Sequence, residues 1–144
     1  METRFVDQRD GEIAELGRIQ MRLLAPSSAT GGRFSAAEFR GSEGSWTIPH
    51  VHEHFEESFY ILEGSFTFTC GGETIEAGRG AFLIVPRDTP HVLSAGAGGG
   101  TLLVVWTPGG LEQMFLDLGG LPAESITDPN VRAEIAQRYD SVPV

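Results

Sequence analysis

The stretch Pro49–Tyr60, with the sequence PHVHEHFEESFY, contains three of the four histidines in this 144-residue chain. These three, His50, His52 and His54, occupy alternate positions. If this part of the chain forms a β-strand, their side chains point to the same face of a sheet. Neutral imidazole is a common ligand of zinc, iron, copper and nickel ions. The pattern therefore predicts a metal site that these histidines line.

Two segments of the chain carry spaced sets of residues: Gly44, His50, His52, Glu57 and Gly64 in the first, and Gly80, Pro86 and His91 in the second. Their combined spacing resembles the two sequence motifs of the cupin family. The second motif departs from the family pattern at Asp88 and Ala95, and neither position is a usual ligand. The resemblance implies a metal held by His50, His52, Glu57 and His91.

The fourth ligand is left open between His54 and Glu57. Strand alternation favours His54, whereas the family resemblance favours Glu57. Three imidazoles and a carboxylate would leave a divalent site with a net charge of +1. Four imidazoles would leave the full +2, which makes a stronger Lewis acid. In that case Glu57 would orient an imidazole or move protons.

The strand pattern predicts an all-β fold. Short segments with apolar alternation, such as SFTFTC at residues 65–70, are separated by Gly and Pro turns, as in sandwiches and barrels. We expect a tight turn at Glu63–Gly64 and a flexible one at residues 95–100 (AGAGGG). The cupin resemblance implies a double-stranded β-helix, or jelly-roll barrel, in a single domain over residues 1–144, with its core at about 18–107.

The tail, residues 108–144, has the pattern of short C-terminal helices. Apolar residues recur with helical spacing at positions 111, 114, 115 and 118. Asp128 and Pro129 supply a capping residue and a proline at the first position of a second helix over residues 129–139. We expect these helices to cover the outside of the barrel rather than its mouth.

Composition limits the classes of partner. The net charge of −10 repels nucleic-acid phosphates and anionic membrane surfaces, and no apolar run approaches the ~20 residues that span a bilayer. All ten basic residues are arginines, so a side-chain Schiff base is excluded. The single Cys70 cannot form an internal disulfide, and the N-terminus lacks the pattern of a secretion signal. We therefore expect a cytoplasmic protein that binds neither nucleic acid nor membrane.

A mainly hydrophobic pocket is expected beside the metal. By strand alternation its walls would be formed by Trp46, Phe59, Ile61, Val104 and Trp106. Such a pocket suits a flat or oily substrate that bears oxygens, and suits sugars or phosphates poorly. Glu57 and Glu56 are the candidate catalytic bases.

The histidine segment, the length and the helical tail resemble single-domain cupin polyketide cyclases of bacterial aromatic polyketide pathways, including the resistomycin pathway. This resemblance implies ring closure of a poly-β-ketone by aldol condensation and dehydration in antibiotic biosynthesis. One divalent metal would act as a Lewis acid. Zn²⁺ is favoured over Fe²⁺, Ni²⁺ and Cu²⁺, because cyclisation needs no electron transfer.

The same resemblance implies a small-molecule polyketide substrate, contact with polyketide synthase components, and a homodimer in which the N-terminal arm crosses to its partner. Two alternatives remain. One is a quercetinase-like cupin dioxygenase, which a redox-active metal would indicate. The other is a non-catalytic cupin that binds a small aromatic molecule, which saturable ligand binding without turnover would indicate.

Overall fold

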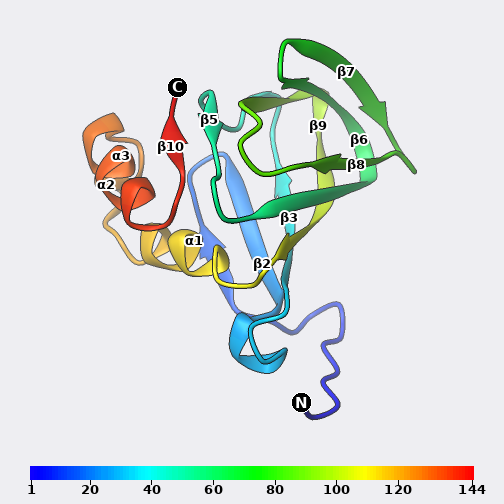
Figure 1. Ribbon diagram of the computed structural model, residues 1–144, viewed down its shortest axis with the longest axis vertical. Coiled ribbons are helices and arrows are strands. Elements are labelled where there is room, and N and C mark those ends of the chain that lie inside the picture. Colours follow the sequence, from blue (N-terminus) through cyan, green and yellow to red (C-terminus); the bar gives the residue numbers. More distant parts are fainter.

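Antiparallel strands make up most of the chain, and short helices follow them (Figure 1). The computed structural model describes residues 1–144. The strands are β1 (Ile13–Glu15), β2 (Ile19–Ala25), β3 (Ser35–Gly41), β4 (Gly44–Ser45), β5 (His50–Val51), β6 (Glu56–Cys70), β7 (Glu73–Gly78), β8 (Phe82–Val85), β9 (His91–Thr107) and β10 (Val142–Pro143). The helices are the 3₁₀ turn η1 (Ser27–Ala29), α1 (Glu112–Gly119), α2 (Ala123–Ile126) and α3 (Pro129–Arg138). The predicted all-β class with short C-terminal helices is confirmed.

Two long strands, β6 and β9, hold the sheet together, because they pair with each other along most of their lengths. The first half of β6 and the second half of β9 lie in a layer with β1, β2, β3 and β8. Their other halves lie in a second layer with β4, β5, β7 and β10. Each long strand therefore passes from one layer to the other.

The passage between layers occurs where the sequence predicted turns. Glu63–Gly64 and residues 95–100 do not reverse the chain but bend β6 and β9, and the pairing of these strands shifts register at the bend. Gly64 has a φ of 75°, and a Cβ there would lie 2.2 Å from the carbonyl oxygen of Gly99. Glycine is the residue that tolerates this backbone and this close approach. The glycine-rich segments therefore fold the sheet over without ending its strands.

Aromatic side chains join the two layers. The ring centroids of Phe59, in the first layer, and Phe68, in the second, lie 5.0 Å apart. Trp46 packs edge-on against Phe66 at 4.8 Å. Both Phe66 and Phe68 are fully buried. Rings of this size supply most of the apolar area that a small core can remove from water.

The two helices predicted from periodicity are present, but their position differs from the expectation. Phe115 of α1 packs against Phe39 of β3 at 5.0 Å and against Trp106 of β9 at 5.7 Å. Both strand residues point into the space between the layers. The helices therefore close the open end of the barrel instead of covering its outer face. α3 begins as predicted, with the Asp128 carboxylate accepting from the backbone N–H of Asn130.

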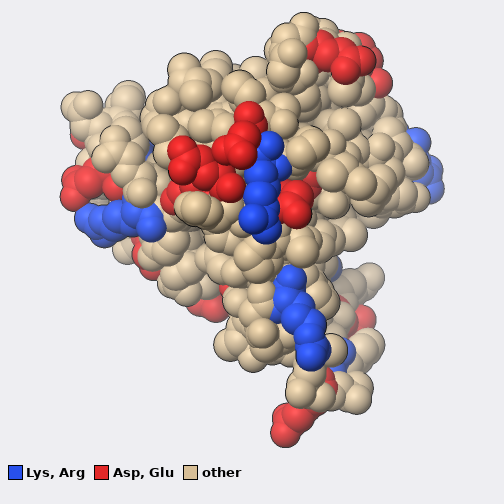
Figure 2. Space-filling view, viewed as in Figure 1, with Lys and Arg blue, Asp and Glu red and all other residues tan.

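The C-terminal strand β10 lies beside the histidine strand β5 (Figure 1). Val142 pairs with Val51, Pro143 pairs with His50, and the N–H of Val144 donates to the carbonyl of Pro49. None of the helices has the length and hydrophobicity needed to cross a lipid bilayer. On the face drawn in Figure 2, several arginine side chains lie directly beside acidic ones, and uncharged residues cover most of the surface.

Candidate metal centre

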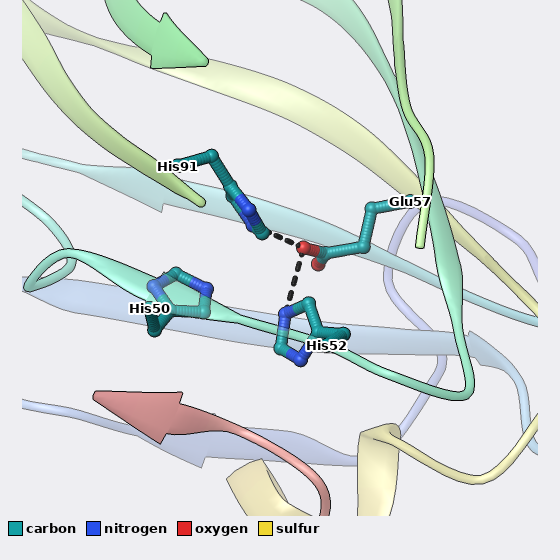
Figure 3. Close-up of side chains that lie close together, drawn as sticks. All are labelled: His50, His52, Glu57 and His91. Atoms are coloured by element: carbon teal, nitrogen blue, oxygen red, sulfur yellow. Dashed lines mark hydrogen bonds and ion pairs between the residues drawn. The ribbon is translucent and has the colours of Figure 1, made fainter. Parts of the chain in front are cut away.

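Three separate segments bring four side chains to one point inside the barrel (Figure 3). His50 lies on β5, with His52 just beyond its end; Glu57 lies at the start of β6, and His91 is the first residue of β9. The register pairs His50 directly with His91. All four residues are buried, with exposed fractions between 3% and 8%. Their potential ligand atoms lie within 4.8 Å of one another.

The carboxylate of Glu57 is held from both sides. Its Oε1 lies 2.8 Å from Nε2 of His91 and 2.9 Å from Nε2 of His52. Its Oε2 accepts a hydrogen bond of 2.8 Å from the indole Nε1–H of Trp106. His50 faces the same point, since its ring centroid lies 4.2 Å from that of His91. Glu57 therefore presents one oxygen to the histidines while Trp106 fixes the other.

The outer nitrogens of the three imidazole rings share one kind of partner. Each Nδ1 contacts a backbone carbonyl oxygen, which can only accept a hydrogen bond, so Nδ1 carries the proton. The contacts join His50 to Ile48 at 2.7 Å, His52 to Asp140 at 2.8 Å, and His91 to Thr89 at 2.9 Å. In the neutral rings Nε2 therefore keeps its lone pair, and this lone pair points into the cluster. Metal-binding histidines are typically oriented in this way.

The donor atoms of the cluster are arranged to surround a cation. The lone pairs on Nε2 face a carboxylate that cannot donate, so the short contacts require a shared proton or a metal ion. Nε2 of His52 is buried without an aligned hydrogen bond, although it lies close to Glu57. Three imidazole nitrogens and one carboxylate oxygen are a donor set suited to zinc, iron, nickel or copper. The residues therefore fit a divalent metal ion.

The charges within the cluster shift its proton equilibria in opposite directions. Burial raises the pKa of Glu57, but the facing rings of His52 and His91 outweigh burial and hold this pKa well below its ordinary value. Burial lowers the pKa of His52, yet the Glu57 carboxylate outweighs it and raises this pKa above 6.5. Burial, together with the nearby His91, lowers the pKa of His50 to about 4. Without a metal, the proton therefore resides between Glu57 and its neighbours, while His50 stays neutral.

His54 lies outside this cluster. β5 ends at Val51, and the chain turns before β6 begins, so the alternation expected to continue to His54 stops. The backbone N–H groups of Glu53 and His54 donate to the Asp140 carboxylate at 3.0 and 2.7 Å. The exposed side chain of His54 groups with these two acidic residues at the surface. Between the two candidates for the fourth ligand, the geometry favours Glu57.

Glu56 is likewise not brought to the site. It precedes Glu57 on β6, and successive strand residues point to opposite faces. Its half-exposed carboxylate forms an ion pair with Arg87 on the outside of the barrel. The expectation that Glu56 could serve as a base at the metal therefore does not agree with the structure.

An apolar cavity of about 330 Å³ begins at the four clustered residues. Trp46, Phe59, Val104 and Trp106 line it as expected, whereas Ile61 is buried in the core and does not reach it. The helices form a further wall of the cavity, although the sequence interpretation placed them on the outside of the barrel. This wall consists of Leu111, Met114, Phe115 and Leu118 of the α1 region and of Arg132, Ala133 and Ala136 of α3. The cavity thus combines hydrophobic walls with polar groups at one end, as small-molecule sites do.

Asp140 is a site residue that the sequence did not reveal. Its carbonyl holds Nδ1 of His52, and its carboxylate holds the turn that follows. It adopts a φ of 60°, which is uncommon for a residue other than glycine. It lies 88 positions from His52, and no local pattern links residues so far apart. Its role emerges only when β10 pairs with β5.

Comparison with known proteins agrees with this geometry. A family described as Cupin domain matches residues 39–108, which include all four clustered residues. The polyketide cyclase RemF from Streptomyces resistomycificus is 32% identical, with a TM-score of 0.63 over 74% of this chain and 80% of that one. KdgF from a Halomonas species has a TM-score of 0.70 over 78% of this chain and 99% of that one, but its identity of 18% indicates a shared fold alone.

A curated relative is named for a different activity. Quercetin 2,3-dioxygenase from Bacillus subtilis is 34% identical over 114 residues, which are 79% of this chain. The matched region is 34% of the dioxygenase, so the chain spans about a third of that protein.

Proposed function

Since the chain belongs to the cupin family, we propose that its metal centre serves a polyketide cyclase, which closes rings of a poly-β-ketone by aldol condensation and dehydration. The observation that carries the proposal is the single cavity that joins a buried three-histidine, one-carboxylate cluster to otherwise hydrophobic walls. The 32% identity to a polyketide cyclase, over 80% of that protein, supports the same activity.

In this proposal His50, His52, Glu57 and His91 would hold one divalent ion, with zinc favoured. The ion would supply Lewis-acid activation of a ketone oxygen. Glu57 is the only carboxylate that lines the cavity, so we propose that its Oε2, the oxygen turned away from the histidines, accepts the proton from the adjacent carbon. Trp106 orients this carboxylate through its indole N–H. Positioning by a rigid donor keeps the base at a fixed distance from the substrate.

The cavity walls would contribute by holding the substrate folded. Phe59, Val104 and Trp106 on the strands and Met114 and Phe115 on α1 all line the cavity. When a polyketide chain is enclosed between these walls, the two carbons that react are held close together. This lowers the entropy cost of ring closure, because the chain is already folded when it reacts. Hydrophobic walls also exclude water and so suppress competing reactions. The proposal further includes a homodimer in the cytoplasm that takes its substrate from polyketide synthase components.

A cupin dioxygenase is the second candidate, supported by the 34% identity to a quercetin 2,3-dioxygenase. The same ligand set accepts redox-active metals. The two candidates differ in whether oxygen is consumed, and this difference is directly measurable. A non-catalytic small-molecule binder is the third possibility for the same cavity.

The test combines metal analysis with turnover. The metal in freshly purified protein is identified by elemental analysis, and zinc-loaded protein is then incubated with a synthase-generated poly-β-ketone in the presence and absence of oxygen. We expect a cyclised, dehydrated product in both atmospheres and its loss in His91→Ala. Oxygen consumption coupled to product would instead favour the dioxygenase. Saturable ligand binding without product would favour the binder.

A further inference from the structure

Arg132, on α3, is the only arginine that lines the cavity. The four clustered residues line the same cavity from the barrel interior, whereas Arg132 belongs to the helical wall. The lining as a whole is mostly hydrophobic. A molecule in this cavity therefore meets the ligand cluster in the barrel and the Arg132 side chain on the helical side.

The guanidinium of Arg132 has no partner of its own. No hydrogen bond or ion pair joins it to any carboxylate or carbonyl, whereas Arg138, on the same helix, pairs with Glu134 at 2.9 Å. The Arg132 residue is exposed overall, although burial of part of the side chain lowers its pKa. An unpaired guanidinium offers five N–H donors to a molecule bound beside it.

We propose that Arg132 binds an acidic oxygen of the substrate, such as a carboxylate or an ionised enol, while a carbonyl group of the same molecule lies at the ligand cluster. This inference rests on the proposed function, because it takes the cavity as the substrate site. It narrows the substrate to elongated apolar molecules that carry a carbonyl group at one end and an acidic oxygen at the other. Arginine suits this role, since its planar donors match the two oxygens of a carboxylate.

Two matched probes test the proposal: 1-phenyl-1,3-butanedione and its derivative with a carboxylate at the para position of the ring. Both carry the same diketone, and they differ only in the charge at the far end. Binding to the zinc-loaded full chain is followed by tryptophan fluorescence, because Trp46 and Trp106 line the cavity. We expect the carboxylate probe to bind about fivefold more tightly, which is the upper end of what an exposed ion pair contributes.

The variants isolate the charge of Arg132. Arg132→Gln should bind the two probes equally, and Arg132→Lys should keep part of the preference. Arg138→Gln is the matched control, since Arg138 lies on the same helix, is exposed and does not line the cavity; it should keep the full preference. The measured quantity is a ratio of two affinities, which a general loosening of α3 would not change selectively.

Three results would overturn the proposal. They are equal affinity of the unaltered protein for both probes, no binding of either probe, and a preference that persists in Arg132→Gln. The third result includes an equal loss of affinity for both probes, because the side chain would then only cover apolar surface. The binding assay needs no turnover, so the two proposals can fail separately. Absence of ring closure would refute the cyclase but would not change the ratio of the two probe affinities. Equal affinities for the two probes would refute the role of Arg132 but not the cyclase.

Discussion

Glu57→Gln and His54→Ala together test which residue completes the metal site. Glutamine has nearly the shape of glutamate, so its amide oxygen can still accept from Trp106. Its NH₂ group would then face the Nε2 atoms of His52 and His91, which lie 2.9 and 2.8 Å from the present oxygen. The amide would donate to the lone pairs that a metal needs, and it would bring no negative charge.

The expected size of the effect follows from this geometry. Loss of a residue that merely orients a ligand costs 10–100-fold in metal affinity. Glu57→Gln removes a direct anionic ligand and blocks two others, so zinc affinity should fall by at least about 100-fold, or about 2.8 kcal/mol. His54→Ala should change affinity by less than about threefold, because its side chain is exposed and only its backbone N–H, which alanine retains, contacts Asp140.

The assay is a competition titration of metal-free protein against a chromophoric zinc chelator at fixed pH, with thermal unfolding to verify the fold of each variant. Metal-free Glu57→Gln should unfold at or above the temperature of the unaltered protein, because its amide satisfies Nε2 atoms that otherwise share a proton. If His54→Ala weakens zinc binding more than Glu57→Gln does, the assignment of Glu57 as the fourth ligand is wrong.

Three further tests concern protons, the C-terminal segment and the bend in β6. Zinc affinity should fall as pH falls through the raised pKa of His52, because a proton then competes for Nε2. Glu57→Gln should flatten this pH dependence in the same titration. An unchanged slope would contradict the reasoning. Asp140→Ala should lower the free energy of unfolding in urea by about 1–2 kcal/mol and weaken zinc binding, since two partly exposed hydrogen bonds disappear; Asp140→Asn should keep most of both. Gly64→Ala should lower the free energy of unfolding by about 3 kcal/mol or more in the same assay. Gly78 has open space around it, so Gly78→Ala should lower it by less than about 1 kcal/mol. Equal losses would refute the argument that Gly64 is needed for the close approach to Gly99.

The cupin resemblance named the four residues that cluster, whereas strand alternation alone favoured His54 over Glu57. The structure places His50, His52, Glu57 and His91 in one buried cluster, as the resemblance implied. This succeeded because a metal site imposes side-chain type and spacing at the same time, and such a combination rarely arises by chance. The alternation of strands β6 and β9 likewise placed Phe59, Val104 and Trp106 on the cavity side.

Local patterns failed where distant residues decide the conformation. The alternation of histidines along the sequence continued to His54. In the structure, the backbone N–H groups of Glu53 and His54 donate to the Asp140 carboxylate, and the chain turns there. Glycine-rich segments looked like turns, yet the neighbouring strands keep pairing through them and convert them into bends. The apolar stripe of α1 was visible, but a stripe does not tell which apolar surface it covers, and Phe115 packs inside the barrel mouth.

The hydrogen bond between His52 and Asp140 also has a consequence for the order of events during translation. Asp140 is 88 positions later in the chain, so at roughly 5–20 residues per second it is added on the order of ten seconds after His52. Throughout that interval the backbone carbonyl that orients the His52 ring is missing. The four-residue cluster can therefore reach its final geometry only after the C-terminal segment has left the ribosome.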